Sequence, residues 1–199
     1  MTTETKTRTY RKRLRAEKEA ETRQRITEAA VRLHGSVGPA RTTVKAVAEE
    51  AGVQRATVYS HFPTESSLFA ACSAHWYSLN PPPDFTAWAA IADPEERLHT
   101  ALGQLYEWYE WAAPMLDRTL RDAPVVPAMA EATEAYRHVF EQMAQTLLRG
   151  RPERGRRRDR ARAAIALALA FETWRTLVRE QGLPRAAAAA LAARAVDVA

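Results

Sequence analysis

Apolar residues recur at helical spacing along most of the chain. Residues 26–37 place apolar side chains at positions i, i+3, i+4, i+7 and i+11: Ile26, Ala29, Ala30, Leu33 and Val37. This stripe is typical of an amphipathic helix with one buried face. Similar stripes follow further along the chain, and no segment shows the alternation of β-branched residues that is typical of strands. The pattern predicts an all-α protein of about nine helices.

Glycine and proline set the expected ends of the N-terminal helices. Gly52 should end a helix over residues 44–51, because glycine adopts a left-handed conformation at little steric cost. Pro63 should end the next helix, because the residue before proline is pushed out of the helical region. A helix that begins after Thr64 must stop at the run Asn80-Pro81-Pro82-Pro83. These breaks predict a basic arm (1–21), a helical domain (22–79) and a second helical domain (84–199).

Proline and glycine also divide the second domain. Asp93-Pro94-Glu95 is a favourable helix start, with a cap, a first-turn proline and an acid at the positive end of the helix. Pro114 is expected to end this helix. Four more helices are then expected, over residues 115–122, 127–149, 160–181 and 185–198.

The helices either side of Gly52 form the most informative pattern. In the first, the small side chain of Ala48 allows the two helices to cross closely. In the second, Val53, Val58 and Phe62 can face the first helix. The outer face then carries Gln54, Arg55, Thr57, Tyr59, Ser60 and His61. Two helices joined at a glycine, the second with exposed cations, hydroxyls and an amide, indicate a helix-turn-helix motif over residues 43–62.

The string AxxAGVxxxTVYxHF, at residues 48–62, resembles the DNA-binding domain of the TetR family of transcriptional regulators. The resemblance covers roughly residues 22–76. It implies that the second helix of the motif enters the major groove, where Arg55 can pair bidentately with guanine. It also implies contacts from Thr57 to a thymine methyl or a phosphate, and from Tyr59 and His61 to phosphates. The full set of candidate DNA contacts is Thr42, Thr43, Gln54, Arg55, Thr57, Tyr59, Ser60, His61, Arg11 and Arg13.

Three positions depart from the family pattern. Gln54 stands where a serine-like cap is usual, and Ala56 replaces a frequent glycine. Glu65 stands where the family usually has a lysine that binds a phosphate, and a carboxylate would repel the DNA backbone. The arm offers compensating charge, since residues 1–25 hold nine basic and four acidic side chains, a net charge of +5. It is either a solvated tail or a DNA contact.

The second domain carries aromatic residues rather than a motif. Such residues are usually core, but together they also suit an apolar pocket. The resemblance implies a small-molecule effector, and a small apolar or aromatic compound fits the aromatic side chains. The candidate pocket residues are Tyr106, Tyr109, Phe140, Met143 and Trp174. The last two helices are the expected homodimer surface, because two recognition helices must read a palindromic operator.

Composition narrows the remaining possibilities. The net charge of +5 is compatible with a polyanionic partner, and the single cysteine, Cys72, excludes an intramolecular disulfide. The longest apolar run, 163–171, is too short to span a bilayer, so we expect a cytoplasmic protein. No catalytic or metal-ligand motif and no cofactor-binding motif is found. The expected function is therefore a repressor released by its effector; the alternatives are a ligand-independent or activating regulator, or an all-helical enzyme.

Overall fold

The computed structural model describes the backbone of residues 3–198 and the side chains of residues 10–198. Within this part of the chain every regular element is helical, which confirms the all-α prediction. The chain divides into two compact units, which we describe separately. The first comprises Met1–Leu79 and Asp117–Ala132, and the second comprises Asn80–Leu116 and Thr133–Ala199.

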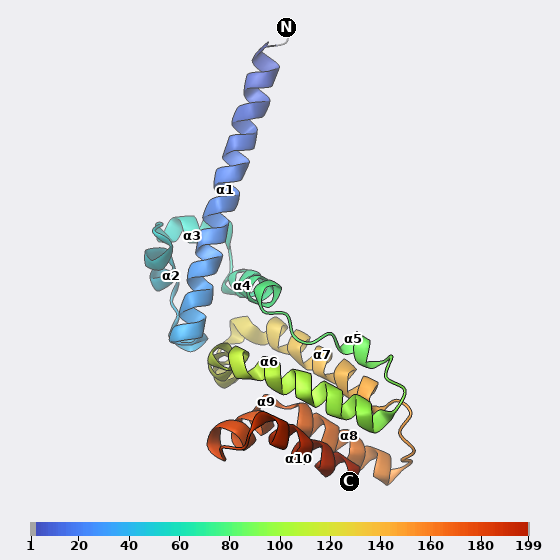
Figure 1. Cartoon of the computed structure of the whole chain (residues 1–199). Helices are drawn as coiled ribbons and strands as arrows, with labels where there is room; N and C mark the ends of the chain where they lie inside the picture. The colour runs from blue at the N-terminus through green and yellow to red at the C-terminus, as the bar shows by residue number, and fades with distance from the viewer. Residues whose placement is uncertain (1–2, 199) are drawn as a thin grey trace. The chain divides into compact units, whose positions relative to one another are not determined.

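Most of the first unit is built from four helices (Figure 1), and their buried side chains form a small apolar core. They are α1 (Thr3–Ser36), α2 (Val44–Ala51), α3 (Arg55–His61) and α4 (Glu65–Leu79). The unit also contains three short 3-10 turns: η1 (Pro39–Arg41), η2 (Ala123–Val125) and η3 (Pro127–Met129). Ile26, Ala29 and Ala30 of α1 are fully buried, as the stripe in the sequence predicted, whereas Leu33 is half-buried and Val37 is 41% exposed. Both α2 and α4 pack against α1.

α1 continues through the basic arm as one helix. Its N-terminal half extends beyond α2, α3 and α4 (Figure 1), and the side chains of residues 10–21 are all exposed. The basic arm is thus helical from Thr3 onward and is continuous with the helix of the apolar stripe. Lys6 and Arg8, also counted in the arm, lie outside the residues whose side chains are described.

The turn between α1 and α2 is held by a buried carboxylate. Asp122, only 4% exposed, accepts a hydrogen bond from the backbone N–H of Ala40 (3.0 Å) and pairs with Arg121 (Nε–Oδ1 2.7 Å). Gly38 adjoins this pair with φ +92°, and a Cβ there would lie 2.5 Å from Asp122 Oδ2. Only glycine combines this backbone conformation with such close approach. The carboxylate therefore fixes the chain just before the helix-turn-helix motif.

The second unit is also helical. Its elements are α5 (Phe85–Trp88), α6 (Pro94–Asp122, whose last six residues belong to the first unit), α7 (Ala130–Leu148), α8 (Arg156–Leu169), α9 (Phe171–Trp174), the π-helical segment η4 (Arg175–Glu180) and α10 (Arg185–Asp197). Asp93 caps α6 as predicted, because its carboxylate accepts from the N–H groups of Glu95 and Glu96. Within the described residues, no helix combines the length and the apolar character needed to cross a membrane.

The prediction that Pro114 ends its helix is wrong. α6 runs without interruption from Pro94 to Asp122, with Pro114 inside it. A proline removes one backbone hydrogen bond and crowds the preceding turn. Ala112, Ala113 and Leu116 are all buried around it, so packing of this segment offsets the lost bond. The short helix expected over residues 115–122 is the end of α6.

The single helix expected over residues 160–181 is also wrong. The chain leaves helical geometry at Ala170 (ψ 136°), and a π-helical segment follows α9. Tyrosine hydroxyls take up the carbonyls at the end of α8: Tyr106 donates to Ala168 O (3.0 Å) and Tyr109 to Leu169 O (2.6 Å). These side-chain donors replace the backbone donors that a continuous helix would have supplied.

Replacing Asp122 should destabilise the protein in a pH-dependent way. The hydrogen bond from Arg121 lowers the pKa of Asp122, and the Ala40 N–H lowers it further against the effect of burial. The stabilisation is therefore present above the pKa of an unfolded aspartate, about 3.9, and lost as pH falls through the lower folded value. We expect Asp122→Asn to lower the free energy of unfolding by about 1–2 kcal/mol at pH 7.

Urea unfolding of both proteins from pH 7 down to pH 3 measures this effect. The difference in the free energy of unfolding between the wild type and Asp122→Asn should shrink below pH 4. Asp159→Asn, at an exposed aspartate of α8, is the matched control and should change little. A destabilisation by Asp122→Asn that stays constant over the whole pH range would contradict the assignment.

Candidate nucleic-acid interface

α2 and α3 are joined by a tight glycine turn. Thr43 caps α2, because its hydroxyl oxygen accepts from the N–H of Ala46 (3.1 Å). Gly52 adopts the left-handed conformation (φ 65°, ψ 39°), and the N–H of Val53 donates back to Ala48 O (2.9 Å). This arrangement satisfies the last carbonyls of α2 and turns the chain directly into α3.

The inner face of α3 is sealed in the core of the first unit. Val58 and Phe62 are 1% and 2% exposed, and they belong to one cluster with Val47, Ala48 and Ile26. The predicted inward direction of Val58 and Phe62 is confirmed, and Val53 packs at the edge of the same cluster. Because α3 has only seven residues, these contacts determine which of its side chains remain outside.

The outer face of α3 carries the polar residues that the sequence pattern placed there. Gln54, Arg55 and Ser60 are exposed, Tyr59 is 45% exposed, and Thr57 and His61 are half-buried. Ser60 donates to the carbonyl of Thr57 (3.0 Å), which holds its hydroxyl on the helix. All six residues predicted for this segment are thus exposed or half-buried, and none is sealed in the core.

Arg23, which was considered above only for its charge, holds α1 against α3. Arg23 donates to the carbonyl of His61 (2.5 Å), and its guanidinium lies 4.0 Å from the centre of the Phe62 ring. A cation over an aromatic face is attracted by the ring quadrupole. Arg23 therefore links α1 to the last turn of α3.

A groove of about 440 Å³ lies between the arm and α3. Its lining comprises Arg11, Leu14, Arg15, Lys18, Glu19, Thr22, Thr57 and His61. The lining residues at positions 11, 15, 18 and 22 follow helical spacing, so they share one face of α1. Arg11 was predicted as a site residue; Arg15 and Lys18 were missed, although this spacing could have identified them. Arg13 is not in the groove lining and pairs instead with Glu17 (3.0 Å).

The two remaining predicted contacts, Thr42 and Thr43, directly precede α2. Thr43 is exposed at the first turn of α2, whereas Thr42 is half-buried and donates to Gly38 O (2.9 Å). Thr64 caps α4 by accepting from the N–H of Ser67 (3.0 Å). Glu65 is exposed in the first turn of α4, where a negative charge favours the helix.

Four of the five predicted effector residues are buried in the second unit. Tyr106, Tyr109, Met143 and Trp174 are at most 1% exposed, and Phe140 is half-buried against Tyr136. The rings of Tyr109 and Trp174 lie 5.8 Å apart. Burial raises the pKa of Tyr109 well above its ordinary value, so its hydroxyl stays neutral. Among the described residues, the buried Nε1 of Trp174 has no hydrogen-bond partner.

Comparison with known proteins connects this geometry to a family. Residues 26–72 match the family described as bacterial regulatory proteins, tetR family. No curated protein matches the chain.

Solved structures share the fold along most of the chain. A TetR-like transcriptional regulator from Rhodococcus sp. RHA1 has 19% sequence identity and a TM-score of 0.61, covering 88% of this chain and 93% of that one. A TetR transcription regulator from Haloarcula marismortui ATCC 43049 has 17% identity and a TM-score of 0.60, covering 90% of this chain and 98% of that one.

The family match covers α2 and α3, where the polar outer face lies, and the similar fold extends into the second unit. Residues 26–72 are therefore similar to the tetR family of bacterial regulatory proteins, and the fold of the chain is similar to that of solved TetR-like transcriptional regulators.

Proposed function

We propose that this protein is a repressor that binds a palindromic DNA operator as a homodimer and leaves it when a small apolar or aromatic effector binds the second unit. The observation that carries the DNA-binding part is the outer face of α3. Its side chains include a guanidinium, a phenol and hydroxyls, and they are held outward by the buried Val58 and Phe62. Such a face supplies the donors that read base edges and phosphates in a major groove.

Within this face the residues have different expected roles. Arg55 lies at the first position of α3, and N-terminal residues of a recognition helix are the ones that reach base edges. Tyr59 and His61 lie further along α3 and are assigned to phosphates. Thr43 offers a hydroxyl together with the N-terminus of α2, which is a favourable place for a phosphate. Thr42, Gln54, Thr57 and Ser60 complete the proposed surface.

The arm is proposed to lie along the DNA backbone beside α3. The groove between arm and α3 is lined by Arg11, Arg15 and Lys18 against one acid, Glu19. Three cations next to the proposed recognition face would attract the phosphate backbone of one DNA strand into this groove. This arrangement would also compensate for Glu65, which repels phosphate. Arg13 would then contribute long-range attraction rather than a direct groove contact.

The homodimer is proposed to form through α8 and α10. The small residues Ala168, Ala188 and Ala192 are buried within one chain, where α8 packs on α10. The accessible apolar side chains are instead Leu167, which is 64% exposed, and Leu191, which is 40% exposed. A second copy covering them would remove apolar surface from water.

The effector site is proposed to use the buried aromatic residues of the second unit. Tyr106 and Tyr109 already donate to carbonyls of α8, so they would supply ring surface rather than donors. The unpartnered Nε1 of Trp174 supports an effector with an acceptor oxygen, because an unsatisfied buried donor is costly. Met143 and Phe140 would complete the apolar wall. The π-helical segment directly after Trp174 is a feature often found at functional sites.

A repressor of this kind acts on chromosomal DNA, so we place it in the cytoplasm. A ligand-independent or activating regulator would use the same α3 surface but would not be released by an effector. An all-helical enzyme would not need that surface at all.

Arg55→Ala should reduce affinity for the operator by about 10- to 100-fold, because one bidentate contact to guanine contributes about 1–3 kcal/mol of discrimination. Affinity for unrelated duplex DNA should change far less. Footprinting on DNA that flanks the protein's own gene defines the operator, and fluorescence anisotropy then measures both affinities. Arg137→Ala, at an exposed arginine of α7, is the matched control. Equal losses of operator affinity in both variants would refute the role of Arg55.

Removing the groove cations should flatten the salt dependence of DNA binding. In a double variant, Arg11→Gln with Arg15→Gln, the slope of log affinity against log salt concentration should fall by roughly 0.9 for each lost phosphate contact. Lys12→Gln with Arg13→Gln changes the same charge outside the groove lining. This control should alter the slope much less. If both double variants give the wild-type slope, the arm does not bind the backbone.

A further inference from the structure

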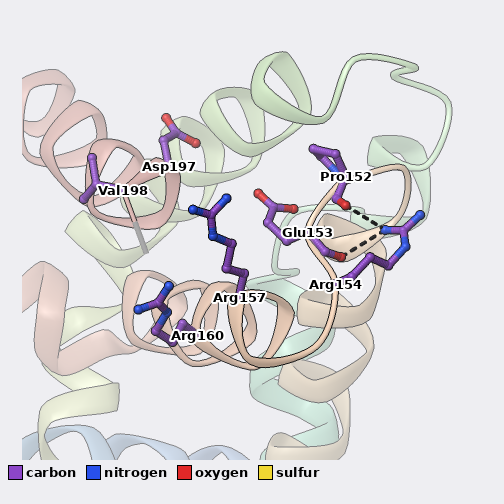
Figure 2. Close-up of a pocket in the computed structure, with 7 residues that line it drawn as sticks. All are labelled: Pro152, Glu153, Arg154, Arg157, Arg160, Asp197 and Val198. Carbon is purple, nitrogen blue, oxygen red and sulfur yellow. Dashed lines mark hydrogen bonds between the residues drawn. The ribbon is translucent and has the colours of Figure 1, made fainter.

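A second cleft lies in the second unit, away from the aromatic effector residues. It has a volume of about 600 Å³, within the range of small-molecule sites. Its walls are the loop before α8, the first turns of α8 and the end of α10 (Figure 2). Five charged side chains line it: Glu153, Arg154, Arg157, Arg160 and Asp197.

Two guanidinium groups of this cleft are available to a ligand. Arg157 and Arg160 are both exposed and lie one helical turn apart on α8. Figure 2 shows Arg157 extending from α8 toward the space between Asp197 and Glu153, with Arg160 beside it. Among the described residues, neither guanidinium has a hydrogen-bond or ion-pair partner within reach. Paired arginines are the side chains best suited to a planar or tetrahedral oxyanion.

The start of α8 adds further donors at the same wall. Its N-cap is Gly155, which provides no side-chain cap, and the first backbone bond runs from the N–H of Asp159 to Gly155 O (3.2 Å). The N–H groups of residues 156–158 therefore have no acceptor within the helix. The positive end of the helix dipole favours an anion at this position, and phosphate is a frequent occupant.

The negative charges of Glu153 and Asp197 in the cleft are balanced by a buried arginine. The side chain of Arg151 is only 4% exposed, and it pairs with Glu153 (3.4 Å) and Asp197 (3.1 Å). Arg154 donates to the carbonyls of Arg151, Pro152 and Glu153, which fixes the loop (Figure 2 draws the last two). Four guanidinium groups against two carboxylates leave a net charge of +2 around the cleft.

Two buried polar atoms at this position are unsatisfied. Within the described part of the chain, Nε of Arg151 and Oε2 of Glu153 have no hydrogen-bond partner. One is a donor and the other an acceptor, and a hydroxyl group can serve either kind. Leaving both unpaired is costly, so a bound group that pairs with either would be stabilised.

We propose that this cleft binds a small phosphomonoester that also carries a hydroxyl group. The phosphate lies against Arg157, Arg160 and the N-terminus of α8, and the hydroxyl donates to Oε2 of Glu153. Charge, cleft volume and the unsatisfied atoms all favour this class of ligand over an apolar effector. The site is independent of the operator surface and of the proposed aromatic effector site.

Calorimetry of the full chain with glycerol 3-phosphate, at ionic strength held constant with potassium chloride, tests the proposal. We expect saturable binding of one ligand per chain, weakened about tenfold or more in Arg157→Gln with Arg160→Gln. Arg156→Gln with Arg162→Gln removes the same charge from α8 outside the cleft and should bind normally. No saturable binding by the wild type, or equal weakening in both double variants, would overturn the site.

Two further measurements need no variant. Inorganic phosphate should bind more weakly than glycerol 3-phosphate, and equal affinities would overturn the assignment of the hydroxyl to Glu153. In amide NMR spectra of the wild type, glycerol 3-phosphate should shift the signals of residues 156–158 most. Shifts centred on other residues would place the ligand outside the cleft.

Discussion

Burial of Val58 and Phe62 determines how the first unit presents α3. A seven-residue helix has almost no stability by itself, so its orientation is set by tertiary contacts. With these two side chains at 1% and 2% exposure, helical periodicity leaves Arg55, Tyr59 and Ser60 on the outside. The proposed DNA contacts thus depend on an apolar interaction. The polar side chains of α3 could not fix this orientation by themselves.

Much of this unit could be predicted from sequence because its signals are local. Gly52 and Thr43 act within one turn of themselves, so their roles do not depend on distant residues. The inward direction of Val58 follows from helical spacing alone. The same holds for Asp93, whose carboxylate meets amides two and three residues away. Where a residue and its partner lie within a few positions of each other, the sequence pattern was sufficient to predict their contact.

Prediction failed where partners lie far apart in the chain. Pro114 remains inside α6 because the packing of its buried neighbours offsets the lost hydrogen bond. The sequence around Pro114 did not indicate that these neighbours would be buried. The helix is interrupted at Ala170, although no glycine or proline stands there. Tyrosine hydroxyls about 60 residues away in the sequence donate to the carbonyls that this interruption leaves free. The link from Arg23 to His61 spans 38 positions. Such contacts are properties of the folded chain and leave no periodic signal.

The proposed function requires the outer face of α3 to lie against duplex DNA, and selection from a pool of randomised duplexes tests this most directly. The wild-type protein should enrich a palindromic sequence whose half-site centres are about 34–36 Å, or a multiple of one helical turn, apart. A variant with both Arg55→Ala and Tyr59→Ala should enrich no sequence while remaining folded. Enrichment of the same palindrome by that variant, or none by the wild type, would contradict the account.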